Sequence, residues 1–167
     1  MYYERHQGSA ALPKVECINP RAGKWLIRWD YKPHTNEEGE EDGITFIEHE
    51  FRHKPTLEEI KAVITEYIND CIKKEITDGF IWNGINVPLS LEDQTNYKRV
   101  LDLASQTKSA NLPCDFWFGT PEEPVRQTFE NVADLRQFWV AADAHINKCI
   151  ADGKEFKAGF DWSEYET

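Results

Sequence analysis

The chain has 167 residues, 40% of them hydrophobic, and a formal net charge of −11. This length and composition are typical of one globular domain and exclude a chain that is disordered throughout. The negative charge repels a phosphate backbone and argues against general nucleic-acid binding. No run of about 18 apolar residues occurs, and residues 1–20 lack a signal-peptide core. We therefore expect no membrane span and no secretion by this route.

The N-terminal third predicts a lead followed by a strand pair. Residues 1–20 show no sustained period and are expected to be loosely ordered, with a short extended piece at 14–18. Residues 24–31 alternate in the two-residue period of a strand with one strongly aromatic face. The acidic segment 33–43 has no apolar residue and predicts an exposed connection. It leads to a second strand at 44–51, which we expect to pair antiparallel with the first.

Three helices are predicted from capping signals, in which Thr, Ser or Asn is followed three residues later by an acid. Apolar residues at three- and four-residue steps place these helices at 57–76, 91–106 and 132–153, the last one stopping at Gly153. Before the second helix, Asn83-Gly84 separates two short β-favouring runs. This pair supplies the positive φ angles of a two-residue hairpin turn.

Another strand pair is expected at 114–118 and 125–129, so that the order of elements becomes ββα-ββα-ββα. This order predicts an α+β fold in which antiparallel β-hairpins alternate with three helices, and the helices pack on one side of the sheet. The expected divisions are a lead at 1–20 and a single domain at 21–167, with a strand pair and helix at 24–77, a hairpin-helix-hairpin-helix at 78–155 and an aromatic tail.

One formal match to a metal site occurs at residues 49–53, which read His-Glu-Phe-Arg-His, the pattern of zinc metalloproteases. That pattern requires a helix, which brings both histidines onto one face at the zinc ion. Here it ends an alternating strand, and the two histidines would lie about 13 Å apart. We therefore reject His49, Glu50 and His53 as metal ligands.

Other catalytic patterns are missing from the sequence. It contains no phosphate-binding loop and no serine-nucleophile elbow, and its four cysteines lie far apart and are expected to be reduced. We interpret His145 and Cys149 as a half-buried histidine beside a core thiol. Nearly all six tryptophans lie on apolar faces and are interpreted as core residues instead of sugar-stacking surfaces. We predict no catalytic residue, no cofactor and no metal.

The remaining polar candidates cluster at the start of the second helix. Asp93, Gln94 and Asn96 lie within its first turn and a half. They would either bind a polar ligand or act as a structural clasp, with Asp93 in the cap and the two amides tied to neighbouring backbone. The clasp is the favoured interpretation.

Several features together resemble a poorly characterised domain of phage and prophage proteins that are often encoded near tail genes. They are a Gly-Phe-x-Trp-Asn-Gly hairpin at 79–84, a Leu-Ser-x-Glu-Asp-Gln-x-Asn helix start at 89–96, a Leu-Pro pair at 112–113 before a strand, and a terminal aromatic tail. The resemblance covers residues 24–167. It implies a phage-derived, non-catalytic protein of virion structure or assembly, with no established catalytic residues to transfer.

The expected function is therefore that of a structural or tail-associated protein that acts through protein–protein contacts. Its partners would be tail or capsid components, in the bacterial host cytoplasm during assembly or in the virion. The alternatives are an assembly chaperone that is absent from the mature particle, and a hydrolase. Segments 33–43 and 119–124 are the expected contact edges. Neither a nucleic acid nor a membrane is expected as a partner, and the sequence does not indicate an oligomeric state.

Overall fold

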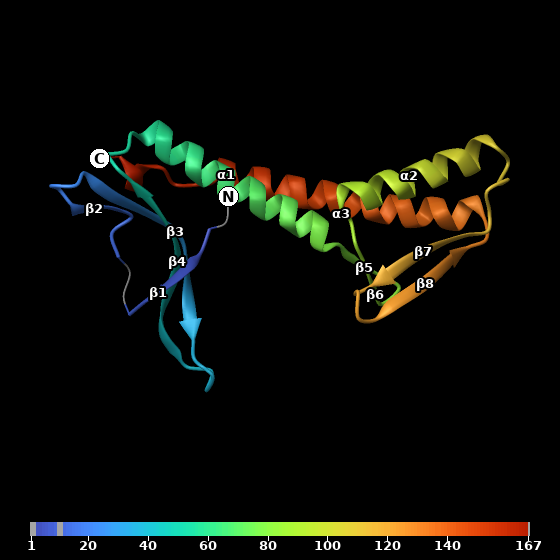
Figure 1. Cartoon of the computed structure of the whole chain (residues 1–167), viewed down its shortest axis with the longest axis horizontal. Coiled ribbons are helices and arrows are strands. Elements are labelled where there is room, and N and C mark those ends of the chain that lie inside the picture. Colours follow the sequence, from blue (N-terminus) through green and yellow to red (C-terminus); the bar gives the residue numbers. More distant parts are fainter. Residues whose placement is uncertain (1–2, 10–11, 167) are drawn as a thin grey trace. The chain divides into compact units, whose positions relative to one another are not determined.

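The computed structural model describes residues 3–9 and 12–166, and these form an α+β fold with antiparallel sheets (Figure 1). Two compact units divide the chain within helix α1. Unit 1 takes the described residues up to Asp70 and those from Gly159 onward, and unit 2 takes Cys71–Ala158. The elements are β1 (Arg5–Gly8), β2 (Val15–Asn19), β3 (Lys24–Thr35), β4 (Glu41–Phe51), α1 (Leu57–Asp78), β5 (Phe80–Trp82), β6 (Ile85–Val87), α2 (Leu91–Gln106), β7 (Cys114–Gly119), β8 (Pro124–Phe129), α3 (Val132–Ala158) and η1 (Ser163–Tyr165).

Unit 1 contains a four-stranded antiparallel sheet in the order β1-β4-β3-β2 (Figure 1). Its outer strands differ from the expected loose lead at 1–20, of which residues 1–2 and 10–11 lie outside the described part. β1 pairs with β4 from Arg5↔Ile47 to Gly8↔Ile44, and β2 pairs with β3. β2 confirms the short extended piece expected at 14–18. β1 was not predicted, because it is stabilised by a strand partner that is distant in sequence.

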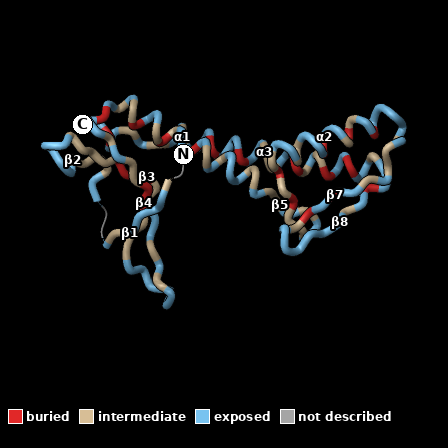
Figure 2. Tube along the Cα trace, viewed as in Figure 1, coloured by how far each residue is buried: buried red, intermediate tan, exposed pale blue. Residues whose placement is uncertain are grey.

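The central hairpin of this sheet extends further than predicted. Strand pairing continues through Pro33↔Ile44 and His34↔Gly43, so the turn shortens to Asn36–Glu40. The Asn36 side chain closes it, because Oδ1 accepts the backbone amides of Glu38 at 3.0 Å and Glu40 at 2.9 Å. Figure 2 shows the tip as exposed, as the sequence predicted.

Arg28 on β3 is the buried charge of unit 1, with 4% of its surface exposed. Its Nε donates to Glu48 Oε2 at 2.6 Å and its Nη1 to Glu16 Oε2 at 2.7 Å. The hydroxyl of Tyr165 in η1 donates to the Arg28 carbonyl at 2.8 Å. A charge is tolerated at this depth because it is paired and hydrogen-bonded. Through these bonds Arg28 links β3 to β4, β2 and η1.

The core of unit 2 is aromatic and centres on Phe138 of α3, which is fully buried. The rings of Tyr97, Phe118 and Phe129 surround it at centroid distances of 5.2 to 5.3 Å. These rings come from α2, β7 and β8, so the core joins both helices to the hairpin. The Asn83-Gly84 turn has the predicted positive φ angles, 49° and 81°.

Helix α3 continues to Ala158, past the stop predicted at Gly153. Gly153 is buried, and a Cβ there would lie 2.1 Å from Ile72 Cδ1 of α1. The glycine therefore permits close helix packing and does not end the helix. All three predicted capping pairs are present, with the side chains of Thr56, Ser90 and Asn131 accepting the amides of the acids three residues later.

Strands of the described residues form three separate sheets, one of four strands and two of two strands, instead of the one sheet that the sequence predicted. The short β5–β6 pair and the β7–β8 pair each stay a hairpin. Hydrophobic contacts, and not a continuous hydrogen-bond ladder, hold these hairpins in unit 2.

Candidate functional site

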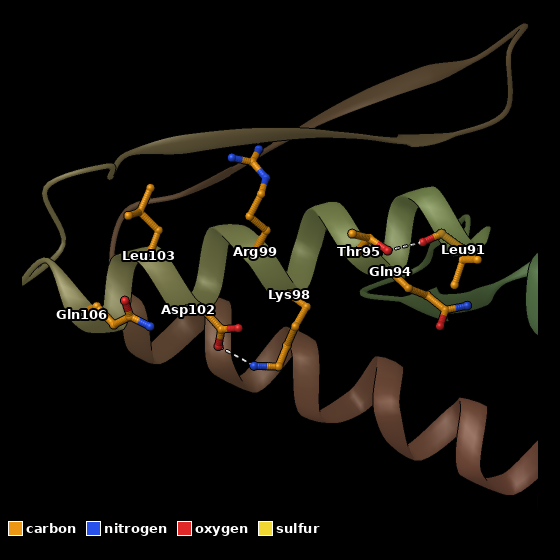
Figure 3. Close-up of a pocket in the computed structure, with 8 residues that line it drawn as sticks. All are labelled: Leu91, Gln94, Thr95, Lys98, Arg99, Asp102, Leu103 and Gln106. Carbon is orange, nitrogen blue, oxygen red and sulfur yellow. Dashed lines mark hydrogen bonds and ion pairs between the residues drawn. The ribbon is translucent and has the colours of Figure 1, made fainter.

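Helix α2 carries a side that the core leaves uncovered. Its buried stripe consists of Tyr97, Leu101 and Ala104. On another side, residues at four-residue steps stay outside, and Leu91 is 78% exposed and Leu103 42% exposed. They belong to a shallow groove of about 610 Å³, which we call the α2 groove (Figure 3). It is lined by Leu91, Gln94, Thr95, Lys98, Arg99, Asp102, Leu103 and Gln106.

Most polar side chains of the α2 groove are already engaged within the helix. The Thr95 hydroxyl donates to the Leu91 carbonyl at 2.7 Å, and Lys98 forms an ion pair with Asp102 (Figure 3). Arg99 extends from the helix on a different side from this ion pair (Figure 3). A guanidinium has five N–H donors, so Arg99 keeps hydrogen-bonding capacity for a partner.

The three predicted polar residues lie at the beginning of this groove and of an adjoining one of about 660 Å³. Asp93 Oδ2 accepts from the Ser90 amide at 3.1 Å and from its hydroxyl at 2.6 Å, completing a capping box. Gln94 Nε2 donates to the Leu89 carbonyl at 2.7 Å. Asn96 Oδ1 instead accepts from Arg99 Nη2 at 3.0 Å. Two of the three thus hold the helix start, and the third positions a groove residue.

The histidines of the metalloprotease-like pattern occupy a strand end and the turn beyond it. His49 lies in β4, and its ring packs edge-to-face with that of Phe51 at 4.8 Å between ring centroids. Burial lowers the pKa of His49. His53 follows the strand and contacts Glu59 Oε1 at 2.9 Å. The two rings do not share a helix face. Residues 3–9 and 12–166 contain no group of three His, Cys, Asp or Glu side chains suited to one metal ion.

His145 and Cys149 lie together on α3, with 3.5 Å between His145 Nε2 and Cys149 Sγ. The thiol is buried, and burial raises its pKa. A thiol with a raised pKa stays protonated near neutral pH, and the protonated form is a poor nucleophile. Phe80 stacks on the imidazole at 5.7 Å, which places the pair in the core packing.

Trp117 of β7 is a surface residue, although the sequence interpretation placed nearly all six tryptophans in the core. It is 63% exposed, whereas its neighbours Phe116 and Phe118 are buried. The two-residue period of a strand places Trp117 on the opposite face from both phenylalanines. The alternation along this strand is the sequence signal that could have identified Trp117 as a surface residue.

No protein-family model, no curated protein and no solved structure matches the chain. In the part of the chain that the structure describes, no helix is both long enough and apolar enough to cross a bilayer. The α2 groove therefore has to be interpreted from its own chemistry. It exposes a leucine at each end and an arginine between them.

Proposed function

We propose that the chain is a non-catalytic structural or tail-associated protein of a phage or prophage and acts through contacts with other phage proteins. The observation that carries the contact role is the exposure of Leu91 and Leu103 at the two ends of the α2 groove. The two leucines are twelve residues apart, about three helical turns, and helices bind partners through apolar side chains exposed along their length. The phage context comes from the resemblance that covers residues 24–167.

A binding role agrees with the hydrogen bonds and ion pair that the polar groups of the groove form. Lys98 and Asp102 form an ion pair, and the Thr95 hydroxyl donates to a carbonyl of its own helix. A reaction centre would need a nucleophile or base directed at a substrate, whereas these groups are directed at one another. What they leave accessible is apolar surface and the remaining donors of Arg99.

The groove also indicates the chemistry of the partner. The partner would present apolar side chains to Leu91 and Leu103. It would present a carboxylate or carbonyl oxygen to Arg99, because Arg binds such oxygens in a bidentate manner. A tail or capsid component would meet the chain in the host cytoplasm during assembly or in the virion. No nucleic acid or membrane is needed for this role.

We further infer that helices cover only one side of the unit 2 strands, as the sequence predicted when it placed the helices on one side of the sheet. Phe116 and Phe118 of β7 are buried, while Asp115 and Trp117 are exposed. The outward side of this hairpin thus stays available as a second surface.

Co-purification tests the proposal. The tagged chain would be expressed during phage or prophage induction, and proteins retained with it would be identified by mass spectrometry. We expect a tail or capsid protein, lost when Leu91 and Leu103 are both changed to serine and retained with Val140→Ser. Val140 is 60% exposed on α3 and lies outside the groove, so it controls for surface substitution.

Two results would contradict the proposal: capture of no phage protein, or equal capture by the leucine variant and the Val140→Ser control. Mass spectrometry of purified virions then separates the two binding roles. A structural protein remains in the particle, whereas an assembly chaperone binds during assembly and is absent from it.

A further inference from the structure

The outward face of the β7–β8 hairpin carries one aromatic ring among polar side chains. Strand pairing places Trp117 opposite Arg126 and Asp115 opposite Thr128. All six tryptophans lie in described residues, and Trp117 is the exposed one. This face is distinct from the α2 groove, whose lining residues all come from α2.

The indole of Trp117 is not covered by the rest of the chain. Among the described residues it has no stacked ring, no cation over its face and no hydrogen-bond partner. Trp162, by contrast, has Phe160 at 4.3 Å and the Lys61 ammonium at 5.6 Å. Exposing an indole in this way costs hydrophobic stabilisation that a bound ligand would restore.

Polar groups beside the indole form a fixed array. Arg126 Nη2 pairs with Asp115 Oδ2, and the Thr128 hydroxyl donates to Asp115 Oδ1 at 2.6 Å. The hydrogen bond from Arg126 and that from Thr128 lower the pKa of Asp115, which stays ionised. The ion pair cancels the local charge. Arg126 retains N–H donors and each Asp115 oxygen retains a lone pair.

We propose that this face binds a neutral, β-linked pyranose oligosaccharide, with Trp117 stacking under one sugar ring and Asp115 and Arg126 hydrogen-bonding its hydroxyls. A pyranose with equatorial hydroxyls has an apolar face of axial C–H groups and a polar rim, and the indole and its neighbours match both parts. The ion pair has no net charge, so it does not favour a charged sugar over a neutral one. β-1,4-Linked chains of such sugars are extended and can run along the outward face of the hairpin.

A second protein fits this face less well than a sugar. Protein interfaces have a core of several apolar side chains surrounded by a polar rim. Here the apolar part is one indole, with Pro124 at the end of the neighbouring strand, and the side chains directly around it are charged or hydroxylic. The sugar proposal does not depend on the α2 groove or on the identity of a phage partner.

Titration of the full chain by ¹H–¹⁵N NMR tests the proposal with cellohexaose and chitohexaose as probes and maltohexaose as an α-linked control. We expect a saturable shift of the Trp117 indole resonance with at least one β-linked probe at concentrations up to about 10 mM, the weak range typical of a single shallow site. Trp117→Ala should weaken binding at least about tenfold, and Arg126→Ala should weaken it at least about threefold. Ile81→Ala, at an exposed position of β5, should leave it unchanged.

Three results would overturn the proposal. The first is the lack of a saturable shift with either β-linked probe. The second is an unchanged shift of the other resonances in a Trp117→Ala variant that keeps the native circular dichroism spectrum. The third is loss of a captured phage protein in that variant without any response to sugar, which would make this face a protein contact. Trp117→Phe keeps an aromatic ring and should retain part of the binding, so it separates loss of stacking from loss of folding.

Discussion

Substitution of Gly79 by alanine tests whether the junction between α1 and β5 is fixed by backbone contact. Gly79 follows the last residue of α1 at a φ of +87°, and its amide donates to the Ile76 carbonyl at 3.1 Å. A Cβ at this position would lie 1.9 Å from the Val87 carbonyl oxygen and 2.8 Å from its carbon. Val87 pairs with Phe80 in the hairpin, so that carbonyl cannot withdraw without disturbing the pairing.

The magnitude follows from two separate penalties. The left-handed backbone costs a non-glycine residue about 1–2 kcal/mol, and forcing a methyl group into packed backbone costs about 1–3 kcal/mol more. We therefore expect Gly79→Ala to lower the free energy of unfolding by about 3 kcal/mol. Gly84→Ala is the matched control, because its φ is +81° but nothing lies within 4 Å of its Cβ. It should show the backbone penalty alone, about 1–2 kcal/mol.

Urea denaturation followed by circular dichroism and tryptophan fluorescence measures both variants against the original chain. Comparing midpoints at a shared slope gives the difference in unfolding free energy. The two probes should agree if the transition is cooperative. Equal losses for Gly79→Ala and Gly84→Ala would refute the contact between Gly79 and the Val87 carbonyl as the cause.

Three further predictions concern the buried charge, a helix cap and a histidine. Arg28→Ala should lower the free energy of unfolding by about 2 kcal/mol in urea denaturation, because two partly exposed glutamates lose their hydrogen-bonded partner; no measurable loss would contradict this. Ser90→Ala should cost about 1 kcal/mol through loss of the capping box, whereas Ser105→Ala, at an exposed position within α2, should be neutral; equal effects would show that the cap is not important. Burial lowers the pKa of His49 below 6.5, so the unfolded chain takes up this proton first as the pH falls. The His49 contribution to stability should thus decrease from pH 6.5 down to the folded-state pKa, and an NMR titration midpoint at or above 6.5 would contradict it.

Local sequence signals predicted the features that are determined within a few residues. Asn83-Gly84 forms the expected turn, and all three capping pairs are present. Both depend on contacts between residues at most three apart, which a single sequence displays directly. The α+β class and the exposed acidic tip followed from the same kind of pattern.

Features that depend on distant contacts did not follow from the sequence. β1 is a strand because β4 lies beside it, almost forty residues later. Gly153 lies within a helix because Ile72 fills the space next to it. Arg28 alternates with apolar residues as an outward side chain would, yet glutamates from two other strands enclose it.

The α2 groove was predictable only in part. The helical period identified the buried side with Tyr97 and Leu101. The same period cannot tell whether Leu91 and Leu103 are covered by another element, because this depends on where the hairpins and α3 lie. The sequence predicted Asp93, Gln94 and Asn96 as a cluster, but which atoms each side chain bonds depends on how the folded helix start places them.

Site-specific photo-cross-linking from Leu91 during phage induction tests the central claim most directly. A photoreactive phenylalanine analogue at this exposed position would form a covalent bond with any protein that occupies the α2 groove, and the same analogue at Val140 is the control. We predict that Leu91 labels one tail or capsid protein and that Val140 does not. Labelling of no phage protein from Leu91, or the same labelling from both positions, would contradict the claim.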